Sequence, residues 1–313
     1  MISVVIPNYN GRRYLEGCLS SLSAQTFRDF EVILADNGSS DGSAEYVAEK
    51  FPMVRIVKNG ANLGFAAGVN SGIRSARGEF ILALNNDTAA DEDLLRSLAG
   101  AMDSDQGVGM CASKMLFLDG RINSVGICLS RSGAAWDRGM GEEDEGQYEE
   151  PCEVFGPSAG AGLYRREMLD EVGLFDEDFF MYMEDVDLAF RGRLAGWRCL
   201  YVPEARVHHV HGGTAGFGSD LSVYYGNRNV LWYPVKDFPR RLLISSLPWI
   251  LGRNLAVVPY YALRGRGRVA LRSKVDGLAG LPLMLRKRKK VLRRAPEREI
   301  RKHIRTWSEI REP

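Results

Sequence analysis

Short apolar runs alternate with amphipathic segments through the first half of the chain. The apolar runs cover residues 2–6, 31–35, 54–57 and 80–84, and polar or turn-forming residues end each of them. Runs of this length are typical of strands buried on both faces of a sheet. Between them, apolar residues recur at helical spacing over 12–24, from 43 onward and over about 62–76. This alternation predicts an α/β fold with a parallel sheet and right-handed crossovers.

Polar side chains gather where three of these strands end. They lie at 8–10, 36–41 and 85–87. In open α/β sheets, ligands bind beyond the carboxyl ends of the strands. A carboxylate such as Asp36 can accept hydrogen bonds from ribose hydroxyls or a base N–H, and the helix beginning near Gly64 can direct free N–H groups at phosphate oxygens. The alternative is that these aspartates only stabilise a turn or cap a helix, and we favour it for Asp41.

Asp87 ends the strand at 80–84 and offers a hard oxygen ligand for Mg²⁺ or Mn²⁺, with waters and substrate phosphates completing the coordination. The alternative is that residues 85–87 form a turn only. The chain has no G-x-G-x-x-G after its first strand and no G-x-x-x-x-G-K-[ST], which argues against a dinucleotide oxidoreductase or a P-loop enzyme. Gly68 and Gly72 we expect to permit close helix packing.

The second half opens with two predicted strands, at 108–113 and 115–118. Residues 131–153 are acidic and rich in glycine, which predicts a surface loop. This loop is either a flap over an acceptor site or a solvated insertion. Gly160 and Gly162 follow in a stretch of small residues, which allows close approach of the backbone to a ligand.

Three carboxylates, Glu184, Asp185 and Asp187, fall in the first turn of a helix predicted to run to Ala195. Mutual repulsion makes such a cluster costly unless a cation or a proton-accepting task uses it, although the helix dipole lowers the cost. Apolar neighbours at 179–182 would desolvate one carboxylate and raise its pKa, which suits a general base. The alternative is an acidic helix N-terminus without further function.

Three of the four histidines lie at 208, 209 and 211. Three histidines beside Gly212 and Gly213 suggest contact with a diphosphate or a metal ion. In a strand, His209 and His211 would share one face.

Apolar segments and a basic run mark the chain beyond Asp220. The apolar pieces cover 242–251, 255–263 and 278–285, and the basic run follows at 286–290. Each piece is shorter than the ~20 residues of a membrane-spanning helix, and we expect Pro248 and Pro259 to break the first two further. Apolar helices beside a basic cluster suit the surface of an anionic membrane. A helical subdomain docked on the core, or an oligomer interface, is the alternative; nucleic-acid binding is disfavoured.

Composition adds little to this picture. The chain has 313 residues and a net charge of +1, which allows one large domain or two. Its five cysteines are scattered without the spacing of a zinc site or a disulfide framework, so we expect a reducing cytoplasm.

Four motifs of the first half, at 4–10, 35–43, 62–65 and 84–88, resemble the glycosyltransferases of family 2, which have the GT-A fold. The segments at 173–180 and 184–187 are similar to the acceptor side of that family. His209, Gly212 and Thr214 match its histidine pattern. Asn85 stands where the family's D-x-D motif has its first Asp, which leaves Asp87 as the anionic ligand.

The resemblance implies a role for each of these positions. It implies nucleotide binding by Pro7, Asn8, Tyr9, Asn10, Asp36, Asn62, Gly64 and Asn86, a Mg²⁺ or Mn²⁺ ion on Asp87 and His209, Asp185 as catalytic base, and acceptor contacts at Glu184, Asp187, Gly160 and Gly162. We therefore predict a GT-A-like domain over 1–218, with a nucleotide-binding half at about 1–105 and an acceptor half at about 106–218. A helical, basic extension would occupy 219–313.

The predicted reaction is inverting transfer of a sugar from a nucleotide-sugar donor, dTDP-rhamnose or a UDP-sugar. The acceptor would be a saccharide or a polyprenyl-linked saccharide, at the inner face of the plasma membrane. Two alternatives remain open from the sequence, namely a nucleotidyltransferase-like enzyme and a non-catalytic scaffold at the membrane surface.

Overall fold

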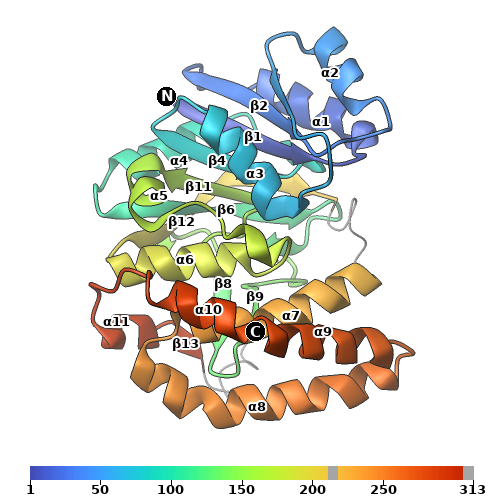
Figure 1. Ribbon diagram of the computed structural model, residues 1–313. Coiled ribbons are helices and arrows are strands. Elements are labelled where there is room, and N and C mark those ends of the chain that lie inside the picture. Colours follow the sequence, from blue (N-terminus) through green and yellow to red (C-terminus); the bar gives the residue numbers. More distant parts are fainter. Residues whose placement is uncertain (211–217, 306–313) are drawn as a thin grey trace.

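A computed structural model describes residues 1–210 and 218–305 of the chain (Figure 1). Its first half has the predicted order of strands and helices. The elements are β1 (Ile2–Asn8), α1 (Arg12–Ser23), β2 (Phe30–Asp36), α2 (Ser43–Lys50), β3 (Arg55–Lys58), α3 (Gly64–Ser75) and β4 (Phe80–Leu84). The four strands are parallel, in the order β3-β2-β1-β4.

The second half extends this sheet on the β4 side. It adds β5 (Thr88–Ala90), α4 (Leu94–Asp103), β6 (Val108–Phe117), β7 (Ile122–Ser124), β10 (Cys152–Glu153), β11 (Ala161–Arg165) and β12 (Arg198–His209). Strand β11 lies antiparallel between β4 and β6, whereas β12 is parallel to β6. The sheet is therefore mixed and mostly parallel, as predicted. The two strands predicted at 108–118 are one strand, β6, and β5 was not predicted.

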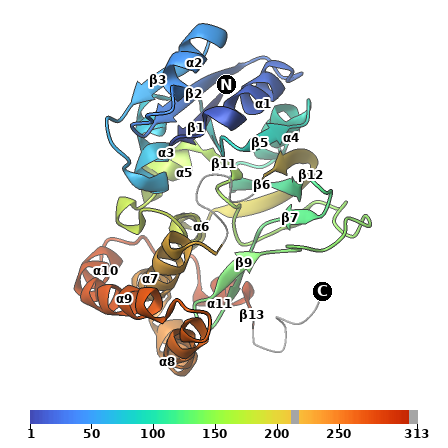
Figure 2. The ribbon, with the colours of Figure 1, turned by 90° about the vertical axis from the view of Figure 1, so that its right-hand side faces the viewer.

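Helices cover both faces of the sheet (Figure 2). The apolar residues of α1, α2 and α4 share one core cluster, and those of α3, α5 (Arg166–Val172) and α6 (Glu184–Ala195) share the other. A Cβ atom on Gly72 would lie 2.3 Å from Cγ1 of Val5, so α3 packs directly on β1. This confirms the predicted packing role of Gly72.

The acidic segment at 131–153 is the predicted surface loop only over residues 138–151, which are turns and mostly exposed. It contains β9 (Ala135–Asp137), which forms a three-stranded sheet with β8 (Ile127–Ser130) and β13 (Ile304–Arg305), and it ends in β10. The fully buried ammonium group of Lys114 lies 2.7 Å from Asp144 and 2.5 Å from Glu149. The acidic residues thus neutralise a buried lysine of β6, and this pairing holds the segment against the large sheet.

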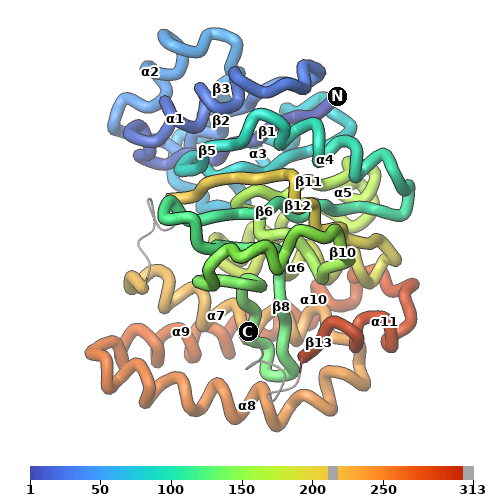
Figure 3. Tube along the Cα trace, turned by 180° about the vertical axis from the view of Figure 1, so that it is seen from behind, coloured from blue at the N-terminus to red at the C-terminus, as the bar shows by residue number. Residues whose placement is uncertain are grey.

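The C-terminal helices form a separate layer beyond α6 (Figures 1 and 3). They are α7 (Asp220–Asp237), α8 (Arg240–Ala262), α9 (Gly267–Ala279), α10 (Leu281–Arg288) and α11 (Glu297–Arg301). Their buried residues, among them Trp232, Phe238 and Met284, belong to the same core cluster as residues of β1 and β4. The extension therefore shares one core with the sheet.

Helix α8 corrects our expectation of two broken apolar pieces. It is continuous over 23 residues although it contains Pro248 and Pro259. A proline in a helix leaves the carbonyl four residues earlier without its hydrogen bond. Both prolines lie on the exposed face of α8, so those carbonyls can bind water and the helix persists.

Candidate active site

The polar residues at three strand ends lie together in the structure. The register of β1 and β2 places Asn8 opposite Asp36. The Asn8 amide donates to Oδ1 of Asp36 at 3.2 Å, and the Asn86 amide donates to Oδ1 of Asn8 at 2.7 Å. The strand ends of β1, β2 and β4 are thus joined by one hydrogen-bonded chain, as the sequence predicted from their positions.

The turn after β1 approaches this chain closely. Asn10 has a positive φ of 51°, which asparagine tolerates, and its side chain accepts a hydrogen bond from the backbone of Ser40 at 2.8 Å. A Cβ atom on Gly11 would lie 2.0 Å from Nδ2 of Asn86. Sequence reasoning missed Gly11, although the Asn-Gly pair marks a tight turn. Pro7 is buried in β1, whereas Tyr9 is exposed beside the cluster.

The N-terminus of α3 is already partly occupied. Oδ1 of Asn62 accepts a hydrogen bond from the Gly64 N–H at 3.0 Å, and the Phe180 carbonyl accepts one from the Ala66 N–H at 3.2 Å. A Cβ atom on Gly64 would lie 2.6 Å from the Phe180 ring. Gly64 therefore makes room for the chain segment before α6, and fewer N–H groups remain for phosphate than the sequence implied.

Asp87 and His209 form the second part of the site. Strand β5 pairs with the end of β12, and this sets His209 opposite Thr88, the residue that follows Asp87. Nε2 of His209 lies 3.1 Å from Oδ1 of Asp87 and 3.3 Å from the amide nitrogen of Asn85. Nδ1 of His209 lies 2.8 Å from Oδ1 of Asn123, which fixes the ring by accepting the Nδ1 proton. Nε2 of His209 therefore faces Asp87.

This pair fits a divalent cation with open coordination positions. In an octahedral shell, two ligands at about 2.1 Å from Mg²⁺ lie about 3 Å apart, close to the separation of Nε2 and Oδ1 here. Among the described residues, no group of three His, Cys, Asp or Glu side chains could hold a metal ion. Two protein ligands leave positions for water and donor phosphates, which is how Mg²⁺ is commonly held beside phosphates.

The three clustered carboxylates of α6 differ in their surroundings. Glu184 is buried, Asp187 is fully buried, and Asp185 is partly exposed. Burial, followed by the charge of Asp185, raises the pKa of Glu184 well above its ordinary value. Burial also raises the pKa of Asp185, although the N–H groups of Ala159 and Val186 oppose the shift. Of the three, Asp185 combines access to solvent with a raised basicity.

Residues 157–160 connect Asp185 to the metal side. The Ala159 N–H donates to Oδ2 of Asp185 at 3.3 Å. One residue further, the Gly160 carbonyl accepts from the Asn85 N–H at 2.9 Å, and Asn85 in turn contacts His209. The loop at 157–160 therefore links Asp185, through Asn85, to the His209 side chain beside Asp87.

Asp137 of β9 belongs to this region, although sequence reasoning missed it. Burial, opposed in part by a hydrogen bond with Ser124, raises the pKa of Asp137 to about 6. The charge of Asp185 contributes to this rise, and the charge of His209 opposes it. Asp137 is thus near both Asp185 and His209. No local signal identifies it, because β9 reaches the site only through its pairing with β8.

Asp187 does not lie on the acceptor side where we predicted it. Its carboxylate is fully buried and lies 2.8 Å from Arg191 and 2.5 Å from Lys236 of α7. Burial opposes ionisation, but these two cations lower the pKa of Asp187 to about 2. Asp187 therefore joins α6 to α7.

Some of the remaining predicted residues contact other parts of the protein, and others lie outside the residues that the structure describes. Cβ atoms on Gly160 and Gly162 would meet Met115 and Pro157, so these glycines accommodate neighbouring side chains. His208 lies 3.4 Å from Asp91, away from Asp87. His211, Gly212 and Thr214 lie outside the described residues.

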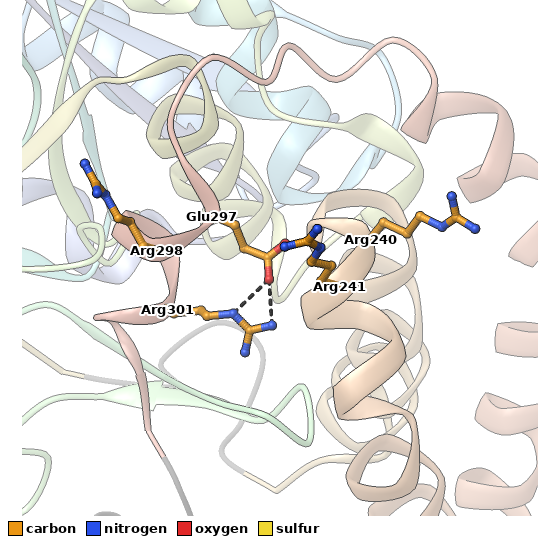
Figure 4. Close-up of a pocket in the computed structure, with 5 residues that line it drawn as sticks. All are labelled: Arg240, Arg241, Glu297, Arg298 and Arg301. Atoms are coloured by element: carbon orange, nitrogen blue, oxygen red, sulfur yellow. Dashed lines mark hydrogen bonds and ion pairs between the residues drawn. The ribbon is translucent and has the colours of Figure 1, made fainter.

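A surface hollow lies between residues of α8 and α11, remote in sequence from the residues described above (Figure 4). It measures about 650 Å³ and is lined by Arg240, Arg241, Glu297, Arg298 and Arg301. Arg301 pairs with Glu297, while Arg240 and Arg298 point away from each other. Diverging side chains do not form an anion site, so we place the active site at the strand ends.

Comparison with known proteins decides the family. The family model described as "Glycosyl transferase family 2" matches residues 3–173. The chain belongs to glycosyltransferase family 2. Its family 2 relatives include an N-acetylglucosaminyl-diphospho-decaprenol L-rhamnosyltransferase of Mycobacterium tuberculosis, 31% identical over 90% of this chain and 98% of the relative. Membership assigns glycosyl transfer to the chain and sets nucleotidyl transfer aside.

Solved structures of other glycosyltransferases share the fold. Staphylococcus aureus TarS (residues 1–349) in complex with UDP-GlcNAc has a TM-score of 0.61 at 17% identity, covering 97% of this chain and 92% of TarS. A Pyrobaculum calidifontis mannosyltransferase in complex with GDP-Man and Mn²⁺ has a TM-score of 0.56 at 18% identity, covering 93% and 84%. These likenesses confirm the GT-A fold predicted from the sequence.

Proposed function

We propose that this family 2 glycosyltransferase transfers L-rhamnose from dTDP-rhamnose, with inversion, to a hydroxyl of a polyprenyl-diphosphate-linked saccharide. The observation that carries the proposal is the short loop that links Asp185 to the Asp87–His209 pair. It supports a base on one side of the reacting carbon and a diphosphate site on the other. UDP-sugars are the second choice of donor.

The reaction needs one proton acceptor and one stabilised leaving group. Asp185 takes the proton of the acceptor hydroxyl while that oxygen bonds to the anomeric carbon, and the bond from this carbon to the diphosphate breaks with its electron pair. Its raised pKa makes Asp185 a stronger base than an exposed aspartate. Glu184 beside it is buried, and one of its carboxylate oxygens has no hydrogen-bond partner among the described residues.

Asp87 and His209 would hold a Mg²⁺ or Mn²⁺ ion. When bound, the ion offsets negative charge on the departing diphosphate. Asn123 keeps Nε2 of His209 directed at this position, and Asn85 lies beside it. Asp36, Asn8 and the turn at 9–11 would hold the nucleoside, since they form one polar cluster at neighbouring strand ends.

The choice of rhamnose and of a lipid-linked acceptor rests on the mycobacterial relative. Its name specifies rhamnosyl transfer and an N-acetylglucosaminyl-diphospho-decaprenol, and the match extends over nearly the whole of both chains. An acceptor carried on a polyprenyl chain requires the enzyme to work at a membrane surface. We therefore propose a peripheral location at the cytoplasmic face of the plasma membrane.

Charge and exposure support contact with an anionic membrane through the α8–α10 layer. Residues 240–290 contain thirteen Lys or Arg and one Asp, although the whole chain is nearly neutral. Helix α8 exposes an apolar stripe at intervals of three or four residues, formed by Ile244, Leu247, Leu251 and Leu255. Near an anionic surface each basic residue contributes about 1 kcal/mol of attraction.

We propose that α8 lies along the membrane and does not cross it. Within the described residues, α8 alone has the length and composition of a spanning helix. However, buried Lys274 of α9 donates to the side chain of Asn254 of α8 at 2.6 Å, and Arg131 donates to the Ser245 carbonyl at 3.0 Å. Insertion across the bilayer would break these contacts or carry charged α9 into lipid.

Asp185→Asn tests the chemistry. The variant should lose transfer while calorimetry shows dTDP-rhamnose binding near that of the unaltered enzyme. Lost donor binding would instead make Asp185 a donor-site or structural residue.

EDTA should stop turnover and Mg²⁺ or Mn²⁺ should restore it, and titration calorimetry with Mn²⁺ should detect binding that Asp87→Asn removes. Full turnover in chelator would refute the metal role.

Vesicle flotation tests the membrane contact. The protein should float with vesicles containing phosphatidylglycerol, and Leu251→Glu together with Leu255→Glu should abolish flotation. Leu118→Glu is the control, because Leu118 is equally exposed but follows β6, outside the α8–α10 layer. Flotation of the double variant at the unaltered level would refute α8 as the contact.

A further inference from the structure

The chain segment directly before α6 has an unusual backbone. Phe180, Tyr182 and Met183 have φ values of 65°, 65° and 68°, in the left-handed region that residues other than glycine seldom adopt. We call residues 179–183 the pre-α6 turn. It follows the 3₁₀ turn at Glu177–Phe179 and precedes Glu184 and Asp185 directly. Such a backbone persists only where its surroundings over-determine it.

Helix α7 supplies those surroundings through Asn229. The Asn229 side chain is fully buried, and its amide nitrogen lies 2.9 Å from the Phe179 carbonyl, 2.9 Å from that of Met181 and 2.7 Å from that of Tyr182. Three carbonyl oxygens of one turn therefore converge on a single donor group. The neighbouring Arg228 donates to the Asp178 and Phe179 carbonyls at 2.8 and 2.9 Å.

We propose that Asn229 is a positioning residue, which holds the pre-α6 turn in its left-handed conformation and thereby sets the position of Asp185 relative to the donor. This inference rests on the proposed function, in which Asp185 is the base. It assigns to the C-terminal helices a part in the reaction in addition to membrane contact.

The donor side also contacts the same turn. The Phe180 ring stacks on Tyr225 of α7 at a centroid distance of 4.7 Å and an interplanar angle of 15°. The Phe180 carbonyl accepts from Ala66, and its ring fills the space that Gly64 leaves at the N-terminus of α3. The turn is thus held between α7 and α3, so its loss would displace the base from the donor site.

The alternative is that Asn229 stabilises the fold as any buried polar residue does. The two roles predict different kinetics. A general loss of stability lowers the amount of active enzyme but leaves the pH profile of the remaining enzyme unchanged. Loosening the turn would instead admit water around Glu184 and Asp185. It would therefore lower kcat and move the acidic limb of the profile to lower pH, because hydration favours the ionised carboxylate.

The matched pair Asn229→Ala and Asn227→Ala provides the test. Asn227 is a buried asparagine of the same helix, but its amide donates only to the Val223 carbonyl of α7 itself. We expect Asn229→Ala to lower kcat at least tenfold, to leave the donor KM within twofold and to move the acidic limb to lower pH. Asn227→Ala should leave kcat within twofold of the unaltered enzyme and should not move the acidic limb of the pH profile.

A double variant separates this inference from the proposed function. If Asn229 acts through Asp185, adding Asn229→Ala to Asp185→Asn should not lower the residual rate further. An active Asp185→Asn enzyme would refute the proposed function itself. An inactive Asp185→Asn enzyme together with a fully active Asn229→Ala enzyme, its acidic limb unmoved, would refute only the inference.

If Asn229→Ala does not fold, a second variant still tests the proposal. Arg228→Met removes the hydrogen bonds to the Asp178 and Phe179 carbonyls and to Oδ1 of Asn229, from a partly exposed position. It should lower kcat less, with a smaller displacement of the acidic limb in the same direction. An unmoved limb with unchanged kcat in this variant would overturn the role of α7.

Discussion

Replacing Asp187 with asparagine should destabilise the protein without removing a catalytic group. The carboxylate has no exposure and pairs with Arg191 at 2.8 Å and Lys236 at 2.5 Å. Removing one partner of a buried ion pair costs about 3–5 kcal/mol. Lys236 would keep Asp176 at 2.6 Å, and Arg191 would keep its bonds to backbone carbonyls, so we expect a loss of about 3 kcal/mol.

Urea unfolding at neutral pH measures this loss. With an m-value of about 3 kcal/mol/M for a chain of this size, the midpoint should fall by about 1 M. Asp178→Asn is the control, because Asp178 also pairs with a lysine, Lys287, but is largely exposed, so its loss should be below about 1 kcal/mol. A midpoint unchanged in Asp187→Asn, together with a large rise in the acceptor KM, would refute our assignment and return Asp187 to the acceptor side.

Three further predictions concern the site. Because burial raises the pKa of Asp137 from 3.8 to about 6, ionisation of Asp137 opposes folding increasingly as the pH rises between these values. In urea titrations at pH 8, Asp137→Asn should therefore be more stable than the unaltered protein by about 1–2 kcal/mol, after discounting for partial exposure. Near pH 4 the two proteins should be equally stable. Gly11→Ala should weaken dTDP binding at least tenfold by calorimetry, since the added Cβ would displace Asn86, and unchanged binding would exclude this turn from the nucleotide site. Burial raises the pKa of Asp185, so kcat should fall with decreasing pH through a limb above pH 3.8; a limb at or below this value would contradict a desolvated base.

The parallel half of the fold could be predicted because its signals are local. Each apolar run of the first half became a strand, and the polar residues that end the runs meet at one edge. Asp87 was indicated by its place after a buried strand and His209 by motif resemblance, and the structure brings them to 3.1 Å.

Other features depend on partners remote in the sequence. Asp187 looks like a third acidic residue of a cluster until Lys236 of α7 lies beside it. Asp137 reaches the site only through the pairing of β9 with β8. The acidic segment that contains Asp137 also provides the carboxylate of Asp144, which pairs with buried Lys114. The continuity of α8 depends on which face its prolines occupy, which the composition alone does not specify.

Strand β13, at the far end of the described chain, has a consequence for how the enzyme matures. It pairs with β8 next to β9, the strand that carries Asp137. During synthesis, the β8–β9 hairpin must wait with an open edge until residues 304 and 305 have left the ribosome. The nascent chain can therefore complete its nucleotide-binding half early, while the sheet that carries Asp137 gains its third strand only after residues 304 and 305 have been synthesised.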